Sequence, residues 1–193
     1  MAAFFVTGSG TDIGKTWICA GLLRHWRARG MHPAAFKPVV SGYDEAAPQG
    51  SDPAELLLAL GRTVDPAALA AIAPFRFRAP LSPDQAAGLE DQALSIDDVV
   101  SACRSAMAAA EGPLLIEGAG GVMTPLNEHD TMLDLAARLG LPVVFVAGSY
   151  LGAISHALTG LHAVRTRGLA GAAVIVNESV TDSVGLAQTA AGL

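Results

Sequence analysis

Short apolar runs alternate with longer segments of helical spacing along most of the chain. The runs end at glycine or at a single polar residue, which is typical of buried strands. The predicted strands are AAFFVT (2–7), PAAFK (33–37), PLLIEG (113–118), LPVVFVAG (141–148) and LAGAAVIVNE (169–178). The predicted helices cover 15–29, 53–61, 66–72, 95–112, 131–140 and 152–168. We expect a loop at 38–52, and three prolines favour a mostly irregular 73–85.

This alternation of strand and helix predicts an α/β fold, with a doubly wound, mostly parallel sheet and helices on both faces. The composition agrees, because 51% of the residues are hydrophobic and only 16% are charged. A sheet that is buried on both faces needs such a composition. Neither a linker nor an internal repeat interrupts the pattern. We therefore expect residues 1–193 to form a single nucleotide-binding α/β domain.

Charge and cysteine content argue against several classes of protein. The net charge of −6 disfavours a nucleic-acid partner, which would require a basic patch. No apolar run reaches membrane-spanning length, and the N-terminus lacks the features of a signal peptide. Cys19 and Cys103 fit neither a metal nor a disulfide spacing, so we expect buried thiols in a reducing cytoplasm.

Residues with useful chemistry follow the predicted strands. Ligands of open α/β sheets bind beyond the carboxyl ends of the strands. The predicted strands end at or beside Gly8, Lys37, Glu117, Gly148 and Asn177. Each strand thus delivers a glycine or a functional side chain to the same edge of the sheet, which indicates a ligand-binding site there.

The first of these ends opens the segment VTGSGTDIGKT (6–16), in which a glycine-rich turn leads into a helix at Gly14-Lys15-Thr16. Backbone N–H groups, a lysine and a hydroxyl are the groups that bind phosphate and its Mg²⁺. A lysine at a helix N-terminus is unfavourable unless an anion binds there. The loop is one residue longer than the common phosphate loop. We interpret it as a variant of that loop, and the fold as P-loop NTPase-like.

Charged residues near this loop are candidates for catalysis. Lys37 is either a surface residue or a charge stabiliser for a transferred phosphoryl group. Asp52, in GSDPAE, is either a helix cap or a metal ligand. Glu117 closes an apolar strand, where a carboxylate without a cation would be costly to bury. This is the place where many nucleotide enzymes hold Mg²⁺ with a carboxylate.

Several motifs point to one family when they are taken together. They are VTGSGTDIGKT, KPVVSG, SD at 51–52, PLSP, IEGAGGVMTPL, LGAISHALTG and VNE. Their order and spacing from residue 3 to about 178 resemble the dethiobiotin synthetases. The resemblance implies a Mg²⁺- and ATP-dependent ligase of biotin biosynthesis. In such an enzyme 7,8-diaminopelargonic acid takes up CO₂ as a carbamate, and ATP activates the carbamate for closure of the ureido ring. It also implies a cytoplasmic homodimer.

The resemblance implies roles for individual residues. Catalysis would depend on Lys37, Lys15 and Thr11, and Mg²⁺ would be held by Thr16, Asp52 and Glu117. The nucleotide would be bound by Asp12, Ile13, Gly14, Lys15, Thr16, Trp17, Asp52, Glu117, Gly118, Ala119, Gly120, Asn177 and Glu178, with Asn177 at the adenine edge. The substrate would contact Ser41, and its carboxylate would bind Gly152, Ala153, Ile154 and Ser155 of the partner subunit.

Two regions depart from the family pattern. SPDQ (82–85) replaces a frequent SPH, and family members usually continue past Asn177 with a proline-containing segment near the purine. Because the sequence stops at Leu193, we expect either a more open base pocket that accepts CTP or GTP nearly as well as ATP, or a missing segment.

The alternative function is an ATPase switch of the partitioning type. Such proteins usually carry a second lysine early in the phosphate loop. This chain has Gly10 at that place, which disfavours the switch.

Overall fold

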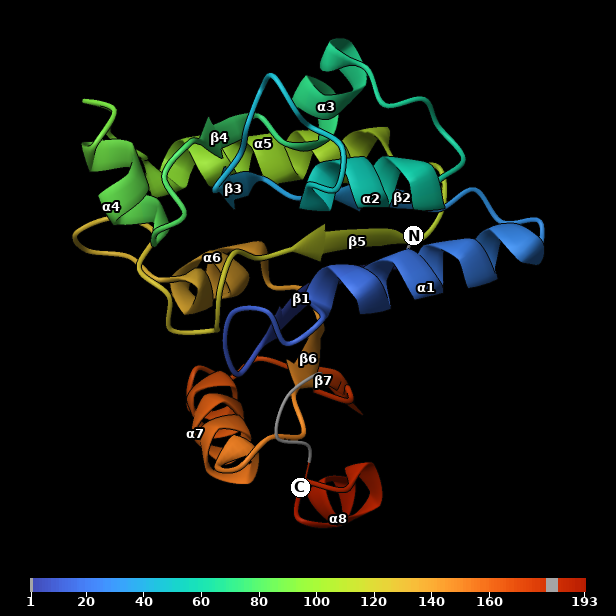
Figure 1. Cartoon of the computed structure of the whole chain (residues 1–193), viewed down its shortest axis with the longest axis vertical. Coiled ribbons are helices and arrows are strands. Elements are labelled where there is room, and N and C mark those ends of the chain that lie inside the picture. The colour runs from blue at the N-terminus through green and yellow to red at the C-terminus, as the bar shows by residue number, and fades with distance from the viewer. Residues whose placement is uncertain (1, 180–183) are drawn as a thin grey trace.

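A computed structural model describes residues 2–179 and 184–193, and its central feature is a sheet of five strands (Figure 1). The strands are β1 (Ala3–Gly8), β2 (Ala34–Phe36), β5 (Leu114–Glu117), β6 (Val143–Ala147) and β7 (Gly171–Val176). Their order is β2-β5-β1-β6-β7, and neighbouring strands pair in parallel. The chain winds from β1 toward one edge and later returns to build the other edge. The predicted doubly wound sheet is therefore confirmed.

Helices cover both faces of this sheet. They are α1 (Lys15–Ala28), α2 (Asp52–Ala59), α3 (Pro66–Ile72), α5 (Ile96–Ala109), α6 (Met132–Leu139) and α7 (Ala153–Thr166). Side chains that are neighbours along a strand enter different cores: Phe5 packs with α5 and α6, whereas Val6 packs with α1, α2 and α3. Phe145 of β6 packs with α7. β5 and β6 are buried on both faces and are therefore mainly apolar, whereas most of the edge strand β7 is exposed.

None of the helices in the described ranges is both long and apolar enough to cross a bilayer.

The helix starts divide into two kinds. Ser51 before α2 and Ser95 before α5 each accept a hydrogen bond from a backbone N–H of the first turn. In contrast, α1 and α7 begin after Gly14 and Gly152, which have left-handed backbone conformations and provide no side-chain cap. Among the described residues neither helix start has a side-chain cap, so its first N–H groups are suited to an anion.

Two regions expected to be irregular contain regular structure. β3 (Val39–Ser41) lies in the predicted loop, and β4 (Phe75–Phe77) lies in the proline-rich segment; the two pair in parallel as a separate small sheet. A short helix, α4 (Pro83–Gly88), follows. The prediction of a loop was wrong at these strands because each has only three residues. So short a segment cannot show the alternation of apolar and polar residues that reveals a strand. α2 and α3 separate the two strands in the chain, so the local sequence does not show their pairing. The sequence pattern also missed α8 (Leu186–Ala191).

Two helical glycines make a matched test of the packing of α7 against the sheet. A Cβ at Gly160 would lie 2.6 Å from Cζ of Phe145, whereas a Cβ at Gly21 of α1 would meet nothing within 4 Å. We expect Gly160→Ala to lower the free energy of unfolding by about 1–3 kcal/mol through overpacking. Gly21→Ala should raise it by about 0.5–1 kcal/mol, since alanine favours a helix. Urea unfolding measures both, and equal effects of the two substitutions would contradict this packing.

Candidate active site

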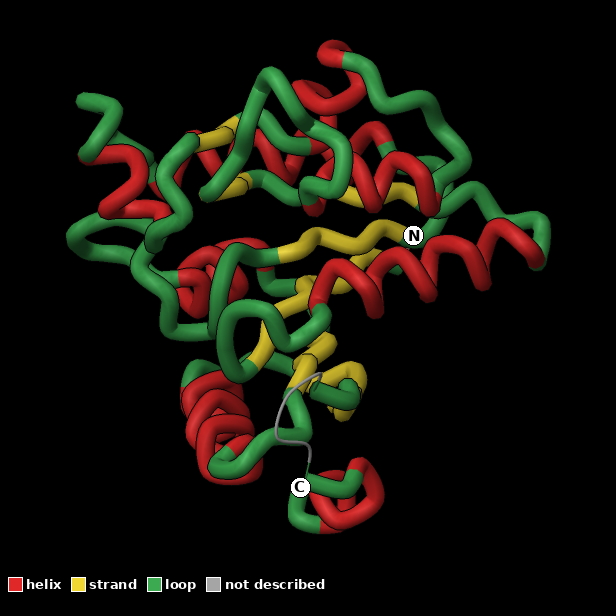
Figure 2. Tube along the Cα trace, in the orientation of Figure 1, coloured by secondary structure: helices red, strands yellow, loops and turns green. Residues whose placement is uncertain are grey.

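The phosphate loop between β1 and α1 curls over the carboxyl edge of the sheet (Figure 2). The backbone N–H of Ser9 donates to the carbonyl of Val146 at 3.0 Å, which ties the loop to β6. The side-chain amide of Asn177 donates to the carbonyl of Ile13 at 3.1 Å, which ties the other end of the loop to the residue after β7. Gly14, at φ +90°, lies directly against this amide, so a Cβ would not fit there. Strands at the centre and the edge of the sheet thus hold the loop from both sides.

Lys15 turns back onto the loop that precedes it. Its Nζ donates to the carbonyl of Gly10 at 2.7 Å, and its side chain is buried. Burial and the nearby ammonium of Lys37 together lower the pKa of Lys15 to about 8. An anion in the loop would favour the charged form of the lysine. The loop is therefore built for a negatively charged ligand.

The buried side chain of Lys37 pairs with two carboxylates, the buried one of Glu117 and the half-exposed one of Asp52. The Nζ of Lys37 lies 2.6 Å from Oε1 of Glu117 and 2.8 Å from Oδ2 of Asp52. Burial alone would lower the pKa of Lys37, but the two carboxylates outweigh it and raise the pKa above its ordinary value. Partial burial would raise the pKa of Asp52, yet Lys37 outweighs this and lowers it. Lys37 is thus a fixed cation rather than a surface residue.

Oxygen atoms of Thr16, Asp52 and Glu117 form a candidate Mg²⁺ site. Oγ1 of Thr16 donates to Oε1 of Glu117 at 2.6 Å. Oε2 of Glu117 is buried and has no hydrogen-bond partner among the described residues, which is costly unless a cation binds it. The described ranges hold no group of three or more His, Cys, Asp and Glu side chains suited to a metal. Water and phosphate oxygens would have to complete the coordination, as is usual for Mg²⁺, so these residues fit the ion.

Two cavities flank the phosphate loop. The β3-side cavity, of about 610 Å³, includes the predicted residues Thr11, Asp12, Lys37, Ser41, Asp52, Ala119 and Gly120. The β7-side cavity, of about 700 Å³, includes the predicted residues Thr11, Asp12, Ile13, Gly14, Trp17, Asn177 and Glu178. Both linings contain Thr11 and Asp12, so the two cavities adjoin at the loop.

The small sheet and α4 give the β3-side cavity its outer wall. Val40 and Ser41 of β3 line it, as do Pro80 and Pro83 from the segment around α4. The hydroxyl of Ser41 is buried and has no partner among the described residues. The structure that the sequence pattern missed therefore contributes directly to the site.

Some predicted residues lie outside both cavities. Gly118 follows β5 and packs against Phe5. Gly152, Ala153, Ile154 and Ser155 form the start of α7 and line neither cavity. Within one chain, the structure does not bring the start of α7 together with Lys37 at either cavity.

Sequence reasoning missed other residues of the site. Thr124 and Pro125 line the β3-side cavity, and Oγ1 of Thr124 accepts a hydrogen bond from the backbone N–H of Gly121 at 2.8 Å, which fixes the turn after β5. Their position inside the motif IEGAGGVMTPL was a signal that could have found them. Tyr150 and Ser179 line the β7-side cavity, and no motif marks them.

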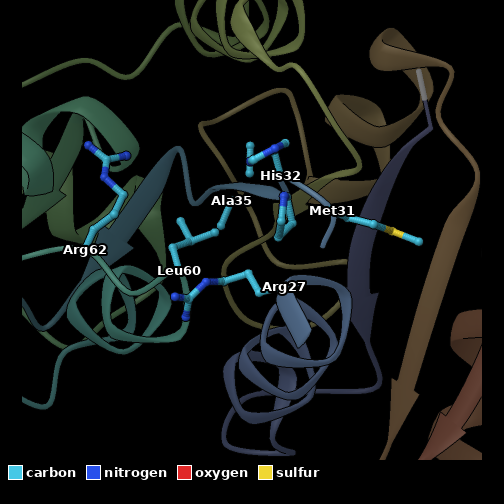
Figure 3. A pocket seen from close by; sticks show the side chains of 8 residues that line it. Arg27, Met31, His32, Ala35, Leu60 and Arg62 are labelled. Atoms are coloured by element: carbon cyan, nitrogen blue, oxygen red, sulfur yellow. The ribbon is translucent and has the colours of Figure 1, made fainter. Parts of the chain in front are cut away.

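A third cavity, of about 220 Å³, lies near the end of α1 (Figure 3). Its lining includes Arg27, His32, Leu60 and Arg62. Nη1 of Arg27 donates to the carbonyl of Ala59 at 3.0 Å, so this side chain caps the end of α2. None of the residues predicted for the site lines this cavity.

The comparisons with known proteins identify the family. A family model described as an AAA domain matches residues 2–191. A relative from Caulobacter sp. (strain K31), named ATP-dependent dethiobiotin synthetase BioD, is 53% identical over 194 residues, which cover 100% of this chain and 83% of the relative. This chain belongs to the ATP-dependent dethiobiotin synthetase family. A relative of the same name from Acidiphilium cryptum is 49% identical, and the matched region covers 92% of this chain and 80% of the relative.

Similarity to solved structures supports the fold alone. The MinC:MinD cell division protein complex of Aquifex aeolicus matches with a TM-score of 0.57 and 10% identity over 100% of this chain and 78% of that chain. That match agrees with the expected α/β fold. The dethiobiotin synthetase relatives are far more similar in sequence, so the alternative of a partitioning-type ATPase switch is not favoured.

Removing Lys37 should destabilise the enzyme strongly. Lys37→Met leaves Glu117, whose side chain is 1% exposed, without its cation, and breaking such a buried pair costs about 3–5 kcal/mol. Arg138→Met is the matched control, because the ion pair between Arg138 and Asp97 is exposed and worth at most about 1 kcal/mol. Urea unfolding without nucleotide measures both. Similar losses for the two variants would mean that Lys37 is not a structural cation.

Proposed function

We propose that this chain closes the ureido ring of dethiobiotin from 7,8-diaminopelargonic acid and CO₂, while ATP is converted to ADP and phosphate. Membership of the family supports the reaction. The observation that carries the proposal is the meeting of two cavities at Thr11 and Asp12 of the phosphate loop. A triphosphate on the loop would place its base in the β7-side cavity and its γ-phosphate toward the β3-side cavity, where a second substrate fits.

The chemistry requires no covalent bond to the enzyme. One amine of the diamine takes up CO₂ as a carbamate, and a carbamate oxygen attacks the γ-phosphorus as the bond to the β-phosphate oxygen breaks and ADP leaves. The second amine then attacks the carbon of the mixed carbamic–phosphoric anhydride, loses a proton and expels phosphate as the ring closes. Positioning and charge neutralisation must therefore carry the rate.

The two lysines supply fixed positive charge on either side of the transferred group. An ammonium has three N–H donors, and Lys37 directs two of them at Glu117 and Asp52, which leaves one for charge that develops in the β3-side cavity. Lys15 would leave the carbonyl of Gly10 and donate to a phosphate oxygen instead. A hydrogen bond from an ammonium to an anionic oxygen is stronger than one to a neutral carbonyl. Thr11 would contact the same group.

The second substrate would occupy the β3-side cavity. The hydroxyl of Ser41, buried there without a partner among the described residues, would hydrogen-bond an amine of the diamine. Thr16, Asp52 and Glu117 would hold Mg²⁺, which when bound supplies positive charge to the phosphates. The ammonium of Lys37 keeps the Asp52 carboxylate ionised in advance, because it lowers the pKa of that group.

Diamine-dependent turnover tests the proposed function. Phosphate release from ATP with Mg²⁺ and bicarbonate should require 7,8-diaminopelargonic acid, and mass spectrometry should find dethiobiotin. At saturating ATP, folded Lys37→Met should turn over at least about 100-fold more slowly because it lacks a charge needed in the transition state. Arg138→Met should keep wild-type turnover, since its ion pair lies on the surface. Phosphate release that ignores the diamine would contradict the proposal.

We also propose that the chain acts as one α/β domain in a homodimer. The start of α7 has no side-chain cap, and Ser155 there is exposed. A helix N-terminus favours a carboxylate. Because residues 152–155 line neither cavity of their own chain, they would bind the substrate carboxylate of the partner subunit's site.

Mixing two impaired variants, at a diamine concentration well below the KM of the Ser155→Asp variant, tests this shared site. Ser155→Asp places a negative charge where the substrate carboxylate would bind and should raise the KM for the diamine. Subunit exchange between Ser155→Asp and Lys37→Met creates heterodimers in which one of the two sites has both residues intact. An equal mixture should therefore regain about a quarter of wild-type activity, since half of the dimers are mixed. A mixture no more active than the separate variants would place the whole site within one chain.

A further inference from the structure

One large aromatic side chain beside the phosphate loop is exposed. Trp17 lies on the first turn of α1, directly after Thr16, and is 68% exposed. The other tryptophan of the chain, Trp26, is partly buried and stacks on Phe4 with ring centroids 6.5 Å apart. Trp17 therefore makes little contribution to the core of the described protein. A single exposed apolar side chain needs no explanation by itself, so the feature that matters is the position of Trp17 in the cavity beside the phosphate loop.

Trp17 forms one wall of the β7-side cavity. Gly14 and Trp17 are three residues apart at the start of α1, so they share one face of the helix. Gly14 belongs to the phosphate loop, and both residues line the cavity. A ligand with its phosphates on the loop would therefore extend past the indole ring.

Tyr150 is a second aromatic side chain that lines the β7-side cavity, and it is held in place without a ligand. Its hydroxyl lies 2.9 Å from Nδ1 of His156, and its ring packs against the apolar cluster that includes Ile13 and Val146. Gly148 makes room for the ring, because a Cβ there would lie 2.8 Å from Cε1 of Tyr150. The tyrosine is thus positioned in advance, whereas the indole of Trp17 is exposed.

We propose that Trp17 and Tyr150 form an aromatic clamp that stacks on the nucleobase of the bound triphosphate. The proposal rests on the function given above and names the groups that bind the base. Aromatic rings bind bases through their π faces and tolerate different bases. A clamp made mainly of stacking favours the larger purines over pyrimidines. Trp17 becomes shielded from water when the base binds.

The fluorescence of Trp17 provides a direct test. Trp26→Phe leaves Trp17 as the sole tryptophan. Titration of this variant with ATP and Mg²⁺ should shift and quench its emission in a saturable way. Inorganic tripolyphosphate with Mg²⁺ should compete with ATP for the loop but leave the emission unchanged, because it has no base. ATP binding measured by equilibrium dialysis, with no change in the emission of Trp17, would overturn the clamp.

Kinetics of variants separate stacking from a structural role. Trp17→Ala should raise the KM for ATP about tenfold or more, with the loss in KM rather than in kcat. Trp17→Phe keeps a π face and should restore most of the affinity. The inhibition constant of tripolyphosphate should be the same in all three proteins. A Trp17→Ala variant with wild-type KM for ATP, or one equally impaired toward tripolyphosphate, would refute the clamp.

The clamp and the proposed function fail in different ways. If phosphate release requires the diamine but the emission of Trp17 ignores ATP, the function holds and the clamp is refuted. If ATP changes the emission of Trp17 but phosphate release does not depend on the diamine, the base site holds and the proposed reaction is refuted.

Leu58→Ala, which removes a 54% exposed side chain from α2, is the control for general effects of losing an exposed apolar group.

Discussion

The buried ammonium of Lys37 is the constraint on which the site depends. A charge this deeply buried is tolerated only if it is paired, and both of its partners come from distant parts of the sequence. Glu117 ends β5, the neighbour of β2, and Asp52 begins α2. To pair the charge of Lys37, β5 must lie beside β2, and the start of α2 must lie close to both strands. The same pairing orients the two carboxylates that fit a metal ion.

The fold also provides a separate cavity for each of the two proposed substrates. The phosphate loop lies between two cavities, and each is walled by a different part of the chain. The small sheet and α4 enclose the side of Lys37 and Ser41, whereas the segments after β6 and β7 enclose the side of Trp17 and Asn177. Transfer of a γ-phosphoryl group from a nucleotide to a second molecule needs such a division, because the attacking and leaving oxygens lie on opposite sides of the same phosphorus.

The sequence predicts the parts of this site that obey general rules of parallel sheets. Lys37 and Glu117 were found because each stands at the carboxyl end of an apolar run, and parallel strands bring those ends together. Strands β3 and β4 escaped prediction because three residues carry no period, and their pairing depends on distant segments. Tyr150 is a single aromatic residue between a strand and a helix, and only the folded chain shows which cavity it faces.

The bond between Asn177 and the carbonyl of Ile13 spans 164 positions of the sequence. Ribosomal synthesis proceeds from the N-terminus, so the phosphate loop emerges early and this partner among the last residues of the described strands. During synthesis the phosphate loop is therefore present for some time before Asn177 is available to hold it in place. Contacts at such separation also slow folding, since a long loop must close before they form.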